Sequence, residues 1–376
     1  MAIGTRPEAI KMFPVIHALR QSGKVAVRVL VTAQHREMLD QVLNFARIEP
    51  DIDLDLMQQG QSLDTLSARI LTEFGKALDR ERPDRVLVHG DTITTMMATL
   101  ACYFRQIPVG HVEAGLRSGD IFAPWPEEIN RKVTSLIADL HFAPTQSAAE
   151  ALLGEGIDEN AIHVTGNTVI DALLHARETI TGSPELTPQI AELKKRTGDR
   201  RIIAVTAHRR ENFGCGLEQV AAAIKRLAQR PDVAVIYPLH PNPSVADLMR
   251  KHLEDTANVL LTPPLDYLEF VGLMEASEII LTDSGGIQEE APSLGKPVLV
   301  MREKTERPEG IAAGTALLVG AKSEAILAQC ERLLDNSQHY AAMAQAHNPY
   351  GDGKAASKIA EIIEVAHAPC AANIAP

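Results

Sequence analysis

Short runs of consecutive apolar residues alternate with longer helical patterns along almost the whole chain, and this alternation constrains the fold most. Strands covered by helices on both faces are apolar on both sides, so they read as continuous apolar runs. Alternating strands and helices predict an α/β protein with parallel sheets. The expected strands are Val25–Val31, Arg85–Val88, Ile107–His111, Leu140–Ala143, Ile162–Val164, Arg201–Thr206, Val233–Leu239, Asn258–Leu261, Glu278–Leu281, Pro297–Met301 and Ala316–Val319, and the expected helices include Thr92–Tyr103, Ile129–Ile137, Leu217–Ala228 and Tyr267–Glu275.

The length predicts two domains. The chain has 376 residues, and single hydrophobic cores stop growing at about 250–300 residues. We expect an N-terminal domain over 1–175, completed by a final helix over 353–367, a second domain over 176–352, and a disordered tail over 368–376. The polar segment Ile180–Asp199 is typical of a seam between domains. Open α/β sheets bind ligands at the carboxyl ends of their strands, so two domains facing each other would place the ligand in a cleft.

The amino-acid composition disfavours several classes of binding partner. Lys+Arg 37 against Asp+Glu 49 gives a net charge of −12, which disfavours nucleic acid and anionic membranes. The cysteines are far apart and form no C-x-x-C pair, which favours a reducing compartment and no structural metal site. No apolar run reaches the roughly 18 residues of a membrane span, and the N-terminus lacks a signal sequence. We therefore expect a cytoplasmic protein.

The segment Thr282–Met301 is the most informative single motif. An apolar strand stops at Asp283-Ser284-Gly285-Gly286, and a helical pattern follows at once. The first N–H groups of a helix have no internal partner and favour anions, and glycines let a phosphate approach the backbone. Glu290 lies further into the helix, within reach of ribose hydroxyls. This layout predicts a nucleotide-diphosphate-sugar site without a Walker lysine; the alternative is an ordinary tight turn.

Charged residues follow the first strands. Thr5 and Glu8 fit a capping box that opens a helix, which places Arg6 at the positive helix end and Lys11 inside it. The strand before this turn has room only for Met1-Ala-Ile. Asp91 follows a buried strand, where it is either a helix N-cap or a catalytic acid.

Two more carboxylate motifs come next. Glu113 lies after a strand between glycines, a position that favours function over packing; Arg117 shares its loop, and His111 is interpreted as structural. Glu127 and Glu128 open another helix, where either could simply favour the helix dipole, and Arg131 could pair with them across one turn.

The second half repeats this scheme at its own strand ends. His208 and Arg210 follow its first strand, and His240 follows the next. An isolated histidine at such a position is usually structural. The acid–base alternation of 305–309, which contains Arg307, is often a solvated loop.

Together these segments closely resemble the non-hydrolysing bacterial UDP-N-acetylglucosamine 2-epimerases. The matching stretches occur in order from the N-terminus to residue 353: GTRPEAIKM (4–12), TAQHREMLDQVL (32–43), VLVHGDT (86–92), IPVGHVEAGLRSGD (107–120), PWPEEINR (124–131), TGNTVIDALL (165–174), TAHRREN (206–212), TDSGGIQEEAPSLGKPVLV (282–300), TERPE (305–309) and NPYGDG (348–353). The family has a full first strand before GTRPE, and here that strand is nearly missing.

The resemblance implies a glycosyltransferase-B-like fold of two Rossmann-like domains facing a cleft, a homodimer, and interconversion of UDP-GlcNAc and UDP-ManNAc for cell-surface polysaccharide. The C2 proton of the sugar is not acidic, so it can leave only with departure of UDP from C1, through a glycal. Such a reaction requires no cofactor, and the chain has no G-x-G-x-x-G fingerprint. The alternatives are a hydrolysing epimerase, an epimerase for a modified UDP-HexNAc, a glycosyltransferase of similar fold, and a nucleotide-sugar sensor without catalysis.

The resemblance also implies roles for individual residues. The expected catalytic residues are Asp91, Glu113, Glu127 and His208, with acid and base unassigned. The residues expected to bind UDP and sugar are Arg6, Lys11, Arg131, Asn212, Phe270, Ser284, Gly285, Gly286, Glu290 and Arg307. A second, allosteric UDP-GlcNAc is expected at Gln34, Arg210 and His240, with Glu127 also among the matched contacts.

Overall fold

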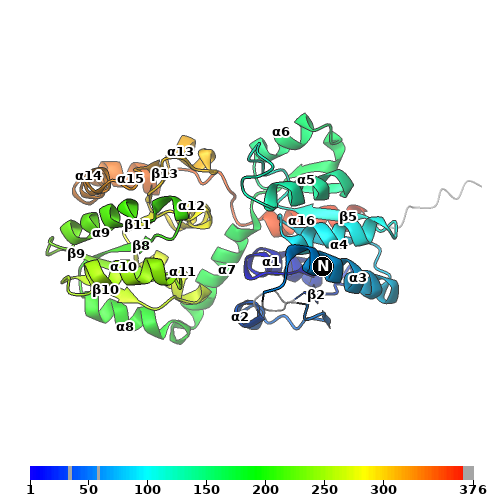
Figure 1. Ribbon diagram of the computed structural model, residues 1–376, viewed down its shortest axis with the longest axis horizontal. Coiled ribbons are helices and arrows are strands. Elements are labelled where there is room, and N and C mark those ends of the chain that lie inside the picture. Colours follow the sequence, from blue (N-terminus) through cyan, green and yellow to red (C-terminus); the bar gives the residue numbers. More distant parts are fainter. Residues whose placement is uncertain (33–35, 57–59, 367–376) are drawn as a thin grey trace, which may run out of the picture. The chain divides into compact units, whose positions relative to one another are not determined.

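The computed structural model describes residues 1–32, 36–56 and 60–366, and the expected tail over 368–376 lies outside this range. The chain divides into two compact units (Figure 1). Unit 1 contains Met1–Ala172 and the chain from Gly351 onward, and unit 2 contains Leu173–Tyr350. Each unit is an α/β body with its own parallel sheet and its own core.

The strands of unit 1 form a three-stranded and a four-stranded parallel sheet that lie against each other in a doubly wound order. β1 (Ala2–Ile3), β2 (Leu30–Val31) and β3 (Ile52–Asp53) pair in parallel, as do β4 (Val86–His89), β5 (Val109–Val112), β6 (Leu140–Ala143) and β7 (Ile162–Val164). Because β1 lies against β4, the strands follow the order 3-2-1-4-5-6-7. The order reverses between β1 and β4, and ligands bind at such a switch point in open α/β sheets.

The helices of unit 1 cover both faces of this sheet (Figure 1). Alternate residues of a strand point to opposite faces. Val86 and Val88 belong to the core cluster of α3 (Leu63–Glu81) and α4 (Ile93–Tyr103). Leu87, between them, belongs to the cluster of α1 (Arg6–Ser22), α2 (Arg36–Phe45) and α16 (Ala355–Ala366). The remaining helices of this part of the chain are α5 (Glu127–Ile137), α6 (Gln146–Gly154), the 3-10 turn η1 (Glu159–Ala161) and α7 (Thr168–Gly182).

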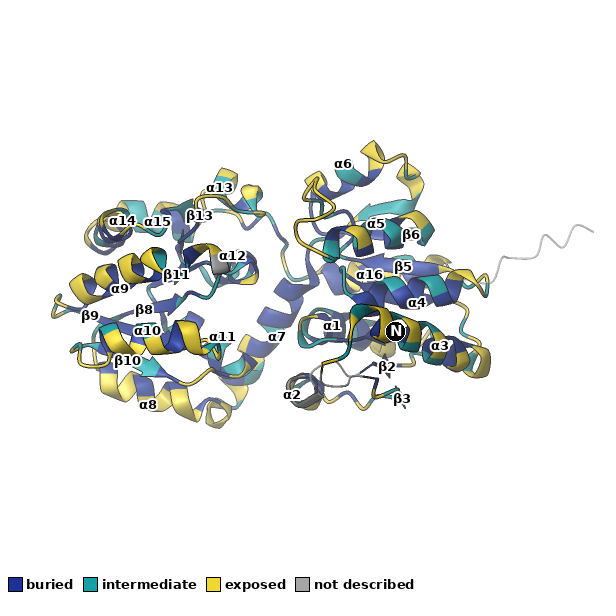
Figure 2. Cartoon of the chain, viewed as in Figure 1, coloured by how far each residue is buried: buried dark blue, intermediate teal, exposed yellow. Residues whose placement is uncertain are grey.

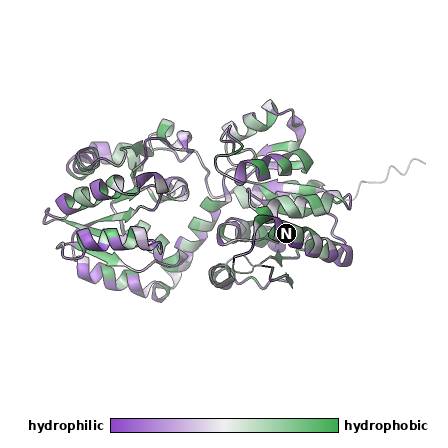
Figure 3. Ribbon diagram, viewed as in Figure 1, coloured by the Kyte–Doolittle hydropathy of each residue, from purple (hydrophilic) through white to green (hydrophobic). Residues whose placement is uncertain are grey.

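Unit 2 repeats the doubly wound topology. Its six strands are β8 (Arg201–Thr206), β9 (Val233–Pro238), β10 (Val259–Thr262), β11 (Ile279–Thr282), β12 (Val298–Val300) and β13 (Ala316–Leu318), in the order β10-β9-β8-β11-β12-β13. The order reverses between β8 and β11, which pair directly. The strands are almost wholly buried and predominantly hydrophobic (Figures 2 and 3).

Helices again pack on both faces of the unit 2 sheet. Ile203 and Val205 of β8 share a core with α9 (Cys215–Leu227), α10 (Pro243–Leu253), α14 (Ser323–Asp335) and Met343 of α15 (Ser337–Ala344). α8 (Pro188–Thr197) and α11 (Tyr267–Ala276) pack together, and α11 also contacts β8. Short helical segments complete the unit: η2 (Pro184–Leu186), η3 (Arg210–Asn212), α12 (Gly285–Glu290), η4 (Ala291–Leu294) and α13 (Pro308–Ala313).

The predicted α/β class with parallel sheets is confirmed, whereas three expected features differ. The expected strand Val25–Val31 is reduced to Leu30–Val31, because β1 offers only two residues to pair with it. β1 lies in Met1-Ala-Ile, where a very short strand was expected, whereas β3 was missed because two residues show no hydrophobic period. The polar segment Ile180–Asp199 is not a seam: it forms the end of α7, η2 and α8 within unit 2, where Glu269 accepts hydrogen bonds from the backbone of α8.

Candidate active site

The predicted polar residues of unit 1 gather after β1, β4 and β5, at the carboxyl edge of the sheet. Glu8 connects two of the turns that carry these residues. Thr5 caps α1 in the expected capping box, and the Glu8 carboxylate accepts hydrogen bonds from the N–H groups of Gly4 (3.0 Å) and Thr5 (2.6 Å). The same carboxylate accepts hydrogen bonds from the hydroxyls of Thr92 (2.8 Å) and Thr95 (3.2 Å). Glu8 therefore ties the turn after β1 to the turn after β4 and fixes the start of the helix that carries Arg6.

Glu113 is the centre of a buried charged cluster. Its backbone is left-handed (φ 61°), which turns the side chain into the sheet edge. Lys11 forms an ion pair with Oε1, and Asn167 donates a hydrogen bond of 3.2 Å to the same oxygen. His89 Nε2 lies 3.1 Å from Oε2. Burial acts to raise the pKa of Glu113, but the charges of Lys11 and His89 outweigh it and hold the pKa well below its usual range. Glu113 is thus an ionised carboxylate.

The loop that carries Glu113 requires a glycine two residues on. Gly115 has φ 90°, and a Cβ there would lie 2.2 Å from the carbonyl oxygen of Ala148. This close approach to α6 fixes the path of the chain out of β5. Arg117, which shares the loop of Glu113, forms an ion pair with Glu155 (2.8 Å) and donates a hydrogen bond to Ser135 (3.1 Å). It therefore stabilises this loop.

Asp91 and Arg131 form the second charged group of unit 1. Arg131 forms an ion pair with Asp91 and another, of 3.0 Å, with Glu128. The N-cap alternative for Asp91 is wrong, because Thr92 caps α4 and accepts from the N–H of Thr95 (3.1 Å). Asp91 is about one third exposed, so its carboxylate remains accessible to a ligand.

The structure separates the two adjacent glutamates that open α5. Glu128 is fully buried, and its carboxylate accepts hydrogen bonds from the N–H groups of Ser118 (3.1 Å) and Gly119 (3.4 Å) as well as from Arg131. Glu127 is half-buried, and in the described part of the chain its carboxylate has no hydrogen-bond or ion-pair partner. Glu128 therefore has a structural role, whereas the Glu127 carboxylate is available for chemistry.

In unit 2, Asp283 organises the turn after β8. Asp283 follows β11 and is fully buried. Its Oδ2 accepts hydrogen bonds from the backbone N–H groups of His208 (2.9 Å) and Arg209 (2.9 Å) and from the side chain of Asn212 (3.1 Å). Asn212 also donates to the carbonyl of Met301 (3.0 Å), beyond β12. One buried carboxylate thus holds together the ends of three neighbouring strands.

His208 lies beside His240, which follows β9. Their rings stack with centroids 5.1 Å apart and planes 11° apart. The pKa of His208 is lowered, mainly by burial; Asp283 opposes the shift, while His240 and Arg209 add to it. His208 is consequently inclined to be neutral at neutral pH. Its predicted catalytic role and the allosteric role of His240 stay predictions.

The turn after β11 has the expected form. Ser284 is the N-cap of α12, which begins at Gly285. A Cβ on Gly285 would lie 3.9 Å from Nη2 of Arg209 and 3.9 Å from Nη2 of Arg307. Two guanidinium groups and a helix start therefore converge in unit 2, a combination that suits a phosphate group. Gly286 is exposed here, and Glu290, the last residue of α12, is half-buried.

The remaining expected residues are less informative. Phe270 lies half-buried on α11, and Arg6 is half-buried at the first position of α1. Arg210 lies in η3, where only its backbone is described, and Gln34 lies outside the described residues.

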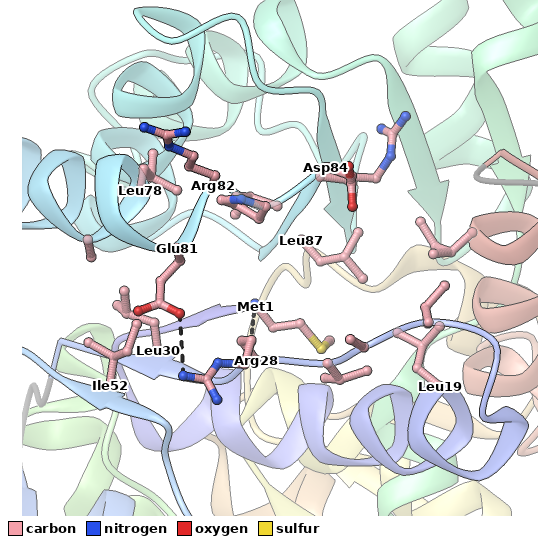
Figure 4. A pocket seen from close by; sticks show the side chains of 18 of the residues that line it. Met1, Leu19, Arg28, Leu30, Ile52, Leu78, Glu81, Arg82, Asp84 and Leu87 are labelled. Atoms are coloured by element: carbon pink, nitrogen blue, oxygen red, sulfur yellow. Dashed lines mark hydrogen bonds and ion pairs between the residues drawn. The ribbon is translucent and has the colours of Figure 1, made fainter. Parts of the chain in front are cut away.

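A groove in the described part of unit 1 lies at the opposite edge of the sheet (Figure 4). It has a volume of about 440 Å³ and is lined by residues that precede β2 and β4, including Arg28, Glu81 and Asp84. The ammonium group of Met1 lines it and donates to the carbonyl oxygen of Arg28 (2.7 Å). No residue of the polar clusters lines this groove, so it is separate from the candidate site.

Sequence reasoning missed three residues with a place in these clusters. His89, Arg209 and Asn167 were inside quoted motifs but were not named as site residues. His89 directly precedes Gly90-Asp91, and Arg209 lies between two named residues. Only contacts across the fold distinguish these side chains from their neighbours.

Two doubly wound α/β units, each with charged groups at its switch point, define a ligand-binding enzyme of the Rossmann-like class. A family model described as UDP-N-acetylglucosamine 2-epimerase matches residues 17–364. The UDP-N-acetylglucosamine 2-epimerase of Yersinia pestis is 51% identical over 363 residues, which cover 96% of this chain and 96% of that protein. The enzyme of the same name from Escherichia coli (strain K12) is 50% identical with the same coverage.

A solved structure gives the same result. The UDP-GlcNAc 2-epimerase of Neisseria meningitidis bound to UDP-GlcNAc has a TM-score of 0.88 and 47% sequence identity, and covers 96% of this chain and 98% of that one. The chain belongs to the UDP-N-acetylglucosamine 2-epimerase family. Among the described residues, no helix is long and apolar enough to cross a membrane.

Proposed function

We propose that this chain is a non-hydrolysing epimerase that interconverts UDP-GlcNAc and UDP-ManNAc. The observation that carries the proposal is the group of Asp91, Glu113 and Glu127 at the carboxyl edge of the unit 1 sheet, in a chain of this family. The relatives named above support the substrate, since they carry the epimerase name and the Neisseria meningitidis structure holds UDP-GlcNAc.

The chemistry explains why several carboxylates are needed. No carbonyl lies next to C2, so the C2–H bond breaks only as the C1–O bond to UDP breaks. The C2–H electron pair forms the C1=C2 double bond of a glycal, UDP leaves with the C1–O pair, and the proton moves to a carboxylate. Return of a proton to the opposite face of C2 and re-addition of UDP give the epimer. Proton transfer from both faces requires at least two groups, which carboxylates in different environments supply.

Unit 2 supplies groups suited to the leaving diphosphate. Arg209 and Arg307 near Gly285, together with the start of α12, would stabilise the negative charge that develops on UDP. Ser284, whose own N–H donates to the Thr282 hydroxyl (3.0 Å), would offer its side-chain hydroxyl, Gly286 would offer its backbone N–H, and Glu290 would hold the ribose. Arg6, Asn212 and Phe270 keep their proposed contacts to UDP or sugar, and His208 keeps its proposed catalytic role. Lys11 is assigned differently: its ion pair with Glu113 favours support of the catalytic carboxylate over direct phosphate binding.

A product assay tests the function. The purified protein is incubated with UDP-GlcNAc, and nucleotides and free sugars are separated by anion-exchange chromatography. We expect UDP-ManNAc to accumulate to a constant ratio with UDP-GlcNAc, without free sugar. Free ManNAc with UDP would instead identify a hydrolysing epimerase. Turnover only with a modified UDP-HexNAc, or only with an added acceptor, would identify a different epimerase or a glycosyltransferase, and either result would contradict the proposal.

The two glutamates at the start of α5 give a matched pair of variants. Glu127→Gln should lower kcat by about 100-fold or more, because the amide cannot exchange the proton, and should leave the thermal unfolding midpoint nearly unchanged. Glu128→Gln should lower the free energy of unfolding by about 1–3 kcal/mol, because two N–H groups and Arg131 lose part of their acceptor. Initial rates and thermal unfolding measured on both variants check this; equal rate losses with equal stability would contradict the division of roles.

Assembly and location follow the family resemblance. We propose a homodimer that works in the cytoplasm without a cofactor. Exposed apolar side chains of unit 1, such as Tyr103 and Leu136, offer surface for a second copy. Cys102, Cys215 and Cys330 are free, which suits a reducing compartment. Sedimentation equilibrium would report the oligomeric state directly.

A further inference from the structure

His89 is a buried titratable residue that the mechanism above does not use. It is the last residue of β4 and is 3% exposed. Its Nε2 approaches Oε2 of Glu113 obliquely at 3.1 Å, and its Nδ1 has no hydrogen-bond partner within the described ranges. A buried imidazole whose Nε2 faces a candidate catalytic carboxylate is well placed to serve that carboxylate.

The two oxygens of Glu113 have different surroundings. Oε1 is occupied by Lys11 and Asn167, which are fixed hydrogen-bond donors. Oε2 faces only His89 among the described hydrogen-bond and ion-pair partners. The fixed donors on Oε1 disfavour protonation there, so a proton taken from the sugar would be held on Oε2, beside the imidazole.

We propose that His89 is a positioning residue that keeps Glu113 competent to take and return the C2 proton. The inference rests on the proposed epimerase function. An imidazole that carries a proton on Nε2 can donate it to the carboxylate, and an imidazole without that proton can accept at Nε2 from the carboxylic acid. No described partner fixes Nδ1, so neither tautomer is locked. His89 can therefore support both protonation states of Glu113 during turnover.

Other charged groups near the pair set its pH dependence. Lys11 faces Glu113 from α1, and the buried Glu8 and His111 interact with His89 electrostatically. Burial raises the pKa of Glu8, while burial lowers that of His111 to about 3. The groups that lower the pKa of Glu113 itself are Lys11 and His89. A folded pKa below the unfolded one means that the ionised form is lost only as pH falls through the lower value.

The test compares His89→Ala and His89→Gln with His163→Ala, which removes a histidine from β7 in the same sheet. His89→Ala should lower kcat by about 10- to 100-fold with a smaller change in KM, and should move the acidic limb of the kcat profile to higher pH, because Glu113 loses one of the groups that lower its pKa. His89→Gln, whose amide still donates, should recover part of both effects. His163→Ala should behave like the parent protein.

A second readout does not depend on activity. The carboxyl resonance of Glu113 in ¹³C-labelled protein, assigned with Glu113→Gln, reports its pKa. A higher pKa in a folded His89 variant together with the kcat loss supports the inference. A higher pKa in a parent protein that does not epimerise UDP-GlcNAc would reject the proposed function while leaving the placement of His89 correct. An unchanged pKa, or an unshifted acidic limb with full kcat in His89→Gln and His89→Ala, would overturn the inference.

Discussion

Replacing Glu113 by glutamine is expected to lower kcat for epimerisation by about 1,000-fold, because an amide cannot accept the C2 proton. The amide oxygen can still accept from Lys11, so the buried ammonium keeps a partner and the fold should persist. UDP binding should change little, because the diphosphate-binding groups proposed above lie in unit 2. Initial rates and isothermal titration with UDP on the same preparation measure both quantities.

The matched control is Glu73→Gln. Glu73 lies on α3 of the same unit and pairs with Lys76 on the surface (2.8 Å), away from the strand ends. Its replacement should leave kcat within about twofold of the parent value, since exposed pairs contribute little. Full activity in Glu113→Gln would contradict the role of Glu113 in proton transfer. Loss of UDP binding in that variant would show that the carboxylate is needed to maintain the folded structure.

Replacing Asp283 by alanine is expected to have the largest effect on stability. Three donors, the N–H groups of His208 and Arg209 and the amide of Asn212, would lose their buried acceptor. Because each unsatisfied buried donor costs about 1–3 kcal/mol, the free energy of unfolding should fall by roughly 3–5 kcal/mol. The turn that positions Arg209 near Gly285 would also lose its anchor, so UDP affinity should fall.

Urea denaturation and UDP titration check this expectation, with Asp335→Ala as the control. Asp335 forms an exposed ion pair with Arg230 (2.7 Å) at the end of α14, and its loss should change neither quantity appreciably. An Asp283→Ala variant as stable as the control, with unchanged UDP affinity, would mean that the three hydrogen bonds do not hold the turn.

The helices and strands that could be predicted from the sequence are those with a clear pattern of apolar residues. The segment 278–281 was predicted as a buried parallel strand, and the structure has β11 at 279–282, because helices cover both faces of the sheet. β3 has only two residues and shows no hydrophobic period, so it was missed, whereas the equally short β1 was expected from the turn that follows it. The polar composition of 180–199 indicated a linker, but helices exposed on one face have the same composition.

The candidate site was predicted in its residue types more than in its contacts. Asp91, Glu113 and the turn at Ser284 were singled out because polar residues at strand ends suit ligand chemistry. Glu127 was singled out at a helix start, and the family resemblance implied the catalytic roles of all three carboxylates. Their partners could not be predicted, since Lys11 and Glu113 are 102 positions apart and only the fold joins them. Composition could not distinguish Glu127 from Glu128 either, because the difference lies in the loop N–H groups that Glu128 binds.

The most direct test of the account is proton NMR of the protein with UDP-GlcNAc in D₂O, observed at C2 of the sugar. Elimination and re-addition require the C2 proton to leave to a carboxylate that exchanges with solvent. We therefore expect deuterium at C2 of UDP-ManNAc as it forms, and its absence in Glu113→Gln. Formation of UDP-ManNAc that fully retains the C2 proton would contradict solvent exchange at the carboxylates, and an unchanged spectrum would contradict the proposed function itself.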